Sequence, residues 1–198
     1  MSASKKISVA IFASGAGSNA LNLLRTARSL KNLWIPLVIV DQKSSSLPES
    51  IAKEFPEVKV SLIEAPSKIR AEHEKLILSE LKEYSIEWCF LAGYMRLLGP
   101  ILLGAFKSRI VNIHPSLLPK YPGLHAYEQA FAAGDSISGV TIHYVDEGLD
   151  TGPIIVQSHF ERHEGDRLED FIRRGKVLEW LLYSNVLTQL NDQGSLAS

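Results

Sequence analysis

Short apolar segments alternate with helical segments along most of the chain, and this alternation constrains the fold more than any other feature. Apolar runs predict strands at 7–12, 33–40, 58–63, 88–91, 109–114, 138–145 and 154–160. Helical patterns fall between most of them, at 21–27, 48–55, 67–84, 101–106 and 127–133, and a long last helix is predicted at 167–190. We therefore expect residues 1–198 to form a single α/β domain with loose tails at 1–6 and 191–198. Its doubly wound (Rossmann-like) sheet should be mostly parallel, with helices on both faces.

Charge and cysteine content narrow the classes of function. Twenty-one basic residues face 22 acidic ones, so a net charge of −1 gives no electrostatic case for nucleic acid or for an anionic membrane. The single Cys89 excludes an internal disulfide and a cysteine-based zinc site, and no metal is expected. Neither a signal peptide nor an apolar run of the roughly 20 residues that span a bilayer is evident, which predicts a cytoplasmic protein. The oligomeric state stays open, a homodimer included.

The stretch from Asn112 to His125 contains side chains that are candidates for catalysis. Side chains at i and i+2 of a strand share a face, so Asn112 and His114 should emerge together. Pro115 should end the strand and release a proline-rich loop at its carboxyl end, where open α/β sheets bind ligands. An amide and an imidazole can donate to a developing oxyanion, and the imidazole can also carry protons. The alternative is that both side chains only satisfy backbone groups.

A glycine-rich turn, Ala13–Asn19, follows the first strand and precedes a helix. Glycines allow close approach of a phosphate, and the amides at a helix N-terminus form an anion site. The turn lacks the third glycine of a dinucleotide fingerprint and the lysine of a P-loop. Phosphate binding and a plain structural turn therefore both remain open.

Three further features suggest ligand contacts. The loop at 92–100 mixes glycine, aromatic, methionine, arginine and leucine residues, a composition that suits a flat apolar ligand or a simple cap on the core. The acidic turn at 146–153 supplies either an ordinary turn or a carboxylate that orients a histidine. Arg70 lies in the first turn of a predicted helix and is either a surface residue or a ligand contact.

Several of these motifs, in this order, resemble the folate-dependent formyltransferase family. They are Gly15–Asn19, Leu91–Arg96, Asn112–Gly123 and Ser138–Pro153, and the resemblance extends from residue 7 to about residue 187. The run His-Pro-Ser-Leu-Leu-Pro-Lys-Tyr-Pro-Gly is the most specific, and it is most similar to the branch that formylates phosphoribosylglycinamide (GAR).

The resemblance implies transfer of a formyl group from the co-substrate 10-formyltetrahydrofolate to the amino group of GAR, in de novo purine biosynthesis. Asn112 and His114 would stabilise the oxyanion and Asp150 would hold His114. The implied GAR-binding residues are Gly17, Ser18, Asn19 and Glu179. The implied folate-binding residues are Arg70, Met95, Arg96, Leu97, Leu98, Asn112, Asp146, Glu147, Gly148, Leu149 and Asp150. Neither a metal nor a covalent enzyme intermediate is implied.

Three rival interpretations remain. A methionyl-tRNA formyltransferase would need an additional nucleic-acid-binding domain and a basic surplus. A formyltetrahydrofolate hydrolase would be expected to carry an N-terminal regulatory domain and a different central loop. A non-catalytic nucleotide-binding module on the same scaffold would bind without turnover, although all three implied catalytic side chains are present.

Overall fold

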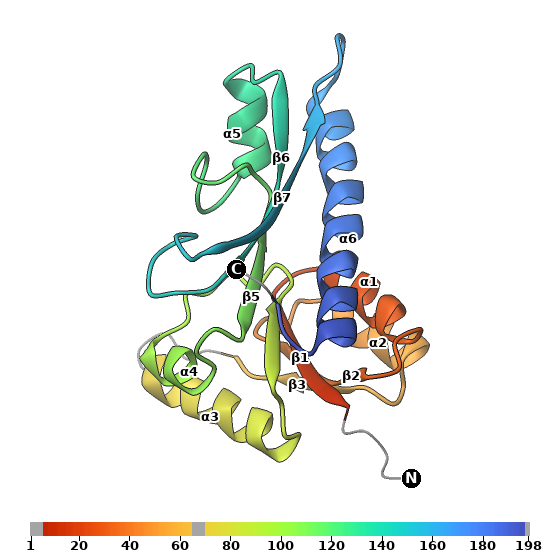
Figure 1. The fold of residues 1–198 in the computed structure, drawn as a ribbon, viewed down its shortest axis with the longest axis vertical. Helices are drawn as coiled ribbons and strands as arrows, with labels where there is room; N and C mark the ends of the chain where they lie inside the picture. The colour runs from red at the N-terminus through yellow and green to blue at the C-terminus, as the bar shows by residue number, and fades with distance from the viewer. Residues whose placement is uncertain (1–5, 65–69, 197–198) are drawn as a thin grey trace.

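The computed structural model describes residues 6–64 and 70–196. The expected tails at 1–5 and 197–198, and the predicted helix start at 67–69, lie outside the described residues. Figure 1 shows one twisted sheet flanked by helices. The strands β6 (Ile137–Tyr144) and β7 (Ile154–Glu161), the helix α5 (Ala126–Ala132) and the start of the helix α6 (Leu168–Gln193) extend together away from the remainder.

The sheet has seven strands in the order β3-β2-β1-β4-β5-β6-β7. The strands are β1 (Ile7–Ala13), β2 (Leu33–Val40), β3 (Lys59–Leu62), β4 (Trp88–Leu91), β5 (Ile110–His114), β6 (Ile137–Tyr144) and β7 (Ile154–Glu161). The first five strands pair in parallel, whereas β6 is antiparallel to both β5 and β7. The predicted doubly wound, mostly parallel sheet is confirmed.

Helices cover both faces of the sheet because its inner strands are apolar on both sides. The helices are α1 (Ser18–Ala27), α2 (Leu47–Glu54), α3 (Arg70–Glu83), α4 (Pro100–Ala105), α5 (Ala126–Ala132) and α6 (Leu168–Gln193). In β1, Val9 and Ile11 join the core beneath α1, α2 and α6, whereas Ala10 and Phe12 join the core beneath α3 and α4. This alternation is the pleat of a strand buried on both faces.

The order of the strands places a crevice at one edge of the sheet. The chain runs outward from β1 through β2 to β3, then returns to place β4 on the other side of β1. The chain crosses over in one direction from β1 and in the opposite direction from β4. This reversal leaves a gap outside the carboxyl ends of β1 and β4, which is the usual ligand site of such sheets. The loops that follow β1, β4 and β5 all begin at this edge.

The C-terminal segment differs from the expected loose tail. Helix α6 runs to Gln193, beyond the predicted end at residue 190, and Gly194 terminates it at φ 74°. Asn191 is buried, and its Oδ1 accepts a hydrogen bond of 2.9 Å from the Asn32 backbone amide. Tyr144 donates its hydroxyl proton to the Leu196 carbonyl at 2.8 Å. Polar composition suggested fraying, but these side chains fasten the segment to the start of β2 and to β6.

Candidate active site

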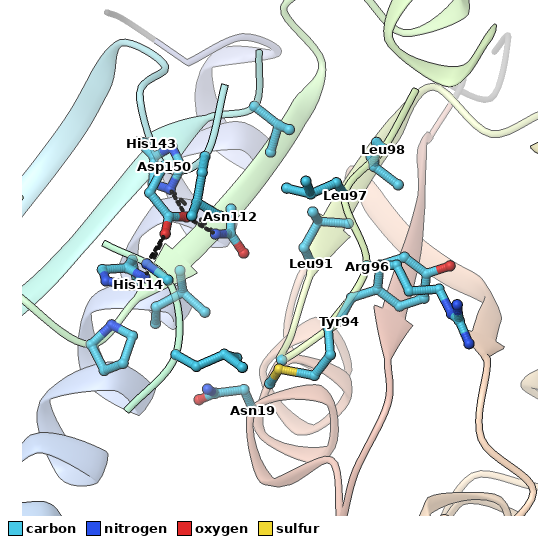
Figure 2. A pocket seen from close by; sticks show the side chains of 18 of the residues that line it. Asn19, Leu91, Tyr94, Arg96, Leu97, Leu98, Asn112, His114, His143 and Asp150 are labelled. Carbon is cyan, nitrogen blue, oxygen red and sulfur yellow. Dashed lines mark hydrogen bonds and ion pairs between the residues drawn. The ribbon is translucent and has the colours of Figure 1, made fainter. Parts of the chain in front are cut away.

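A cavity of about 390 Å³ occupies the crevice at the carboxyl edge of the sheet. Figure 2 shows its two sides, with the polar cluster of β5 and β6 facing the loop that follows β4. The lining residues are Asn19, Leu91, Gly93, Tyr94, Met95, Arg96, Leu97, Leu98, Asn112, Ile113, His114, Pro115, Gly123, Leu124, His125, His143, Val145, Asp146, Gly148, Leu149, Asp150, Lys176 and Glu179. Its wall therefore joins segments from α1 to α6.

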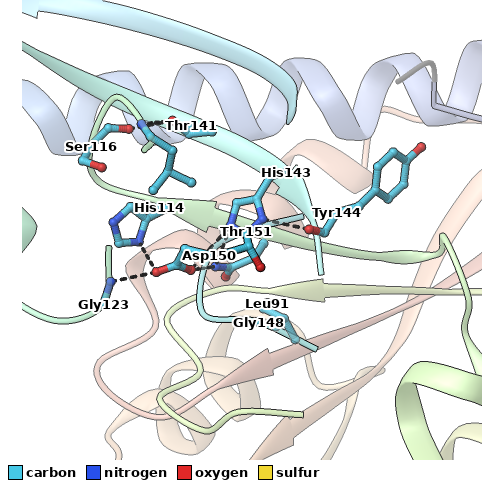
Figure 3. Close-up of polar contacts among 12 residues, drawn as sticks. Leu91, His114, Ser116, Gly123, Thr141, His143, Tyr144, Gly148, Asp150 and Thr151 are labelled. Carbon is cyan, nitrogen blue, oxygen red and sulfur yellow. Dashed lines mark hydrogen bonds and ion pairs between the residues drawn. The ribbon is translucent and has the colours of Figure 1, made fainter. Parts of the chain in front are cut away.

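Asn112, His114 and Asp150 meet in one cluster on this wall. The Asp150 Oδ2 atom lies 3.3 Å from His114 Nδ1, and its Oδ1 atom accepts from Asn112 Nδ2 at 3.3 Å. The Gly123 backbone amide also donates to Oδ2, at 2.8 Å. Figure 3 shows the contacts from His114 and Gly123 converging on the carboxylate, and Figure 2 shows Asn112 beside it. The structure thus brings together the three side chains expected to be catalytic, and their roles in turnover stay predictions.

Asp150 is held as an anion although it is largely buried. Burial raises the pKa of the Asp150 carboxyl, but interactions with His143, the Gly123 amide and His114 together hold that pKa below its usual range. Its backbone is left-handed, with φ 55°, a conformation that aspartate tolerates better than most residues. The turn therefore holds a negative charge next to the imidazole of His114.

His143 belongs to the cluster and was missed by sequence reasoning. It pairs with Asn112 across β5 and β6, and Asn112 Nδ2 lies 3.2 Å from His143 Nε2. His143 Nδ1 lies 2.8 Å from the Tyr144 carbonyl, which can only accept, so Nδ1 carries a proton, and His143 Nε2 lies 3.6 Å from Asp150 Oδ1. The alternating pattern of β6 was the only sequence signal for His143. Placing this side chain beside Asn112 also requires the antiparallel register of β6 on β5, which the sequence does not give.

The donors expected to face an oxyanion are directed at protein acceptors. The Asp150 carboxylate only accepts, so the Asn112 amide must present its NH₂ to it, and His143 Nε2 lies 3.2 Å from the same amide nitrogen. The Asn112 oxygen is consequently turned toward the cavity (Figure 2). His114 Nε2 donates to the Tyr121 carbonyl at 2.8 Å. Donation to a ligand by His114 Nε2, or by the Asn112 proton that Asp150 accepts, therefore requires release of a protein acceptor.

The glycine turn leads directly into α1. Gly17 has φ 71° and a Cβ there would lie 2.6 Å from Leu47, so both backbone conformation and space favour glycine. Among the described residues no side chain caps α1, which leaves its first amides for a ligand. Asn19 lines the cavity, whereas Gly17 and the exposed Ser18 are not among its lining residues.

The residues expected to bind folate divide between the wall and its surroundings. Met95, Arg96, Leu97, Leu98, Asn112, Asp146, Gly148, Leu149 and Asp150 line the cavity. Glu147 is exposed and is not among the lining residues. Arg70 also lies outside the lining, but its guanidinium donates to the Leu98 carbonyl and pairs with Glu74.

Arg96 is anchored by a buried carboxylate. Its Nε donates to Asp41 Oδ2 at 2.6 Å, and the Asp41 side chain is almost fully buried. Behind the same loop, the Ser14 hydroxyl accepts from the Met95 amide at 2.9 Å. The ends of β1 and β2 therefore support the loop that follows β4.

Two further findings concern metal binding and membrane-spanning helices. Within 6–64 and 70–196, no set of three or more histidine, cysteine, aspartate or glutamate residues is grouped to hold a metal ion. None of the helices in those ranges combines the length and the apolar character needed to cross a membrane.

Comparisons with known proteins agree with this architecture. The model of the formyl transferase family matches residues 7–187. The phosphoribosylglycinamide formyltransferase of Bacillus subtilis (strain 168) is 40% identical over 194 residues, which cover 95% of this chain and 98% of that protein. A trifunctional purine biosynthetic protein of Drosophila pseudoobscura pseudoobscura is 37% identical over 186 residues, which cover 92% of this chain but only 14% of that protein.

A solved structure extends the agreement to three dimensions. The crystal structure of phosphoribosylglycinamide formyltransferase from Bacillus halodurans superposes with a TM-score of 0.86 at 43% identity, covering 95% of this chain and 97% of that chain. Together with the family match over most of the sequence, these similarities establish that the chain belongs to the formyl transferase family.

Proposed function

We propose that the protein transfers the formyl group of 10-formyltetrahydrofolate to the amino group of GAR. The observation that carries the proposal is the position of the Asn112, His114 and Asp150 cluster. It lies in one cavity between the N-terminus of α1, suited to a phosphate, and a mostly apolar wall, suited to a flat ring system. The names of the relatives support formyl transfer to GAR.

GAR would enter with its phosphate at the start of α1. The uncapped amides near Ser18 and Asn19 would donate to the phosphate oxygens, and the helix dipole would favour the negative charge. The ribose would lie toward Glu179, which lines the cavity and presents a carboxylate. Asn19 Oδ1, buried and without a hydrogen-bond partner among the described residues, offers a second acceptor there.

The folate would occupy the side of the cavity formed by the loop after β4 and the acidic turn. Met95, Leu97 and Leu149 are at least half exposed there, so a flat ring stacked between them would bury apolar surface. Backbone groups of the loop and of Asp146–Asp150 would meet its polar edges. Arg70 is exposed beside Leu98, where it would meet the negatively charged glutamyl tail.

The reaction would begin when the neutral amine of GAR attacks the formyl carbon. A C–N bond forms, and the carbonyl electron pair moves to oxygen to give a tetrahedral oxyanion. Asn112 or His114 would then donate to that oxygen after leaving a protein acceptor. For His114, which would exchange the neutral Tyr121 carbonyl for a charged oxygen, this exchange is favoured as charge develops, because hydrogen bonds to a charged oxygen are stronger. The site then stabilises the transition state more than the substrate.

Collapse of the intermediate would complete the transfer. The oxyanion re-forms the carbonyl, the bond from carbon to the folate nitrogen breaks, and that nitrogen gains a proton while the attacking amine loses one. Asp150 would keep His114 oriented and balance its positive charge when it is protonated, or pass the amine proton onward through water. Formylated GAR and tetrahydrofolate are the products, and no covalent enzyme intermediate is needed.

An acceptor panel tests this proposal. Purified protein would be given 10-formyltetrahydrofolate with GAR, with no acceptor but water, or with charged initiator tRNA, and tetrahydrofolate would be measured. We expect release that depends on GAR. Equal release without an acceptor would indicate a hydrolase, release only with tRNA would indicate the other transferase branch, and no release with any acceptor would contradict catalysis.

A further inference from the structure

Glu179 is a buried carboxylate held by donors from three helices. Asn19 of α1 donates to its Oε2 at 2.6 Å, and Lys176, one turn earlier on α6, lies 3.1 Å from the same oxygen. Tyr127 of α5 donates its hydroxyl proton to Oε1 at 2.8 Å. The side chain is only 3% exposed, yet it lines the cavity. Its orientation is therefore set by these partners rather than by solvent.

The two carboxylate oxygens are not equally occupied. Each oxygen of a carboxylate has about two acceptor positions. Oε2 faces both Asn19 and Lys176, whereas Oε1 faces the phenol of Tyr127 alone among the described residues. One acceptor position on Oε1 is left for a ligand hydroxyl. Because Tyr127 is the donor on that oxygen, it fixes where this position points.

Helix α6 makes room for the phenol with a glycine. A Cβ on Gly175 would lie 2.4 Å from the Cζ and hydroxyl oxygen of Tyr127. Glycine inside a helix costs stability relative to alanine, and here it stands one turn before Glu179. The ring is further fixed edge-to-face against Phe171, with centroids 6.2 Å apart. Burial and the adjacent Glu179 carboxylate raise the pKa of Tyr127, so its hydroxyl keeps the proton that it donates.

We propose that Tyr127, reaching Glu179 through the space left by Gly175, is a positioning residue that aims the carboxylate at a hydroxyl of the ribose of the acceptor. The inference rests on the proposed function, since it takes GAR as the ligand. Tyr127 acts only through Glu179: it does not line the cavity and takes no part in formyl transfer.

Steady-state kinetics of Tyr127→Phe test the inference. The substitution removes one hydroxyl and keeps the packed ring, so we expect the KM for GAR to rise about 3- to 10-fold, the effect of one net hydrogen bond. The kcat and the KM for 10-formyltetrahydrofolate should stay within about twofold, because the reacting groups are untouched. In a Glu179→Ala background, which removes the acceptor of the Tyr127 hydroxyl, the same change should have no further effect, since residues that act as a unit are not additive.

A ligand analogue and a matched control separate positioning from general structure. With a GAR analogue that lacks the ribose hydroxyls, wild type and Tyr127→Phe should bind equally. Tyr183→Phe removes another buried phenol, which donates to the Leu91 and Val111 carbonyls, and should leave the KM for GAR unchanged. Gly175→Ala, which presses a methyl group on the phenol, should reproduce the Tyr127→Phe shift.

The outcomes distinguish this inference from the proposed function. An unshifted KM for GAR in Tyr127→Phe, an equal loss with the analogue, or an additive loss in the Glu179→Ala background would overturn the positioning role. A wild-type protein that does not formylate GAR would instead overturn the proposed function. If Tyr127→Phe does not fold, an unshifted KM in folded Gly175→Ala overturns the inference alone.

Discussion

Asp150→Asn is the substitution that most sharply tests the catalytic cluster. It keeps the shape of the side chain but removes the charge that lies 3.3 Å from His114 Nδ1. At an effective dielectric constant of 20, two unit charges at that separation attract by about 5 kcal/mol, an upper limit for a site open to water. If about 3 to 4 kcal/mol of this attraction stabilises a protonated His114 in the transition state, its loss should lower kcat by about 10² to 10³.

The assay is the GAR-dependent release of tetrahydrofolate at saturating concentrations of both substrates. Glu164→Gln is the control, because it removes an equal charge at an exposed position outside the cavity lining, and its kcat should stay within about twofold of wild type. Circular dichroism and a urea melt should report a folded protein for both variants. A kcat for folded Asp150→Asn within threefold of wild type would refute the argument.

Three further predictions follow from local geometry. Folding lowers the pKa of Asp150, so its carboxylate stabilises the protein at pH values above its unfolded pKa of about 3.9, and this stability is lost at lower pH. In urea melts, the difference in unfolding free energy between wild type and Asp150→Asn should be constant above about pH 5 and should shrink below about pH 4. A difference that does not depend on pH would contradict this prediction. Gly17→Ala places a methyl group 2.6 Å from Leu47 on a backbone with φ 71°. We expect the free energy of unfolding to fall by about 1–2 kcal/mol and calorimetry to show weaker GAR binding. Unchanged values of both would argue against a constrained turn. Asn191→Ala leaves the Asn32 amide without its acceptor and should cost about 1–3 kcal/mol of unfolding free energy while kcat stays the same; an unchanged urea midpoint would mean that the segment frays.

The parts of the site that depend on local sequence could be predicted. The period of two along β5 placed Asn112 and His114 on one face, and Pro115 marked the end of the strand. The glycine turn before α1 was likewise evident, because a single stretch of chain contains the strand, the turn and the helix. Such features need only the geometry of neighbouring residues.

The parts that depend on contacts distant in sequence could not be predicted from the residues alone. His143 reaches Asn112 only because β6 returns antiparallel to β5, and no local pattern fixes that register. The hydrogen bond from Tyr127 to Glu179 joins residues 52 positions apart. The segment around Asn191 is ordered, contrary to the expected tail, because it is hydrogen-bonded to Asn32, just before β2, and to Tyr144 of β6, which are distant in sequence.

The central claim is that the formyl group passes directly from the folate to the amine within the cavity that contains His114 and Asp150. A single turnover with ¹³C-formyl-labelled 10-formyltetrahydrofolate and GAR, carried out in ¹⁸O-water and analysed by NMR and mass spectrometry, follows that carbon. Direct transfer predicts all of the ¹³C on the nitrogen of formylated GAR with no ¹⁸O attached to it. Labelled formate containing ¹⁸O as the main product would contradict it.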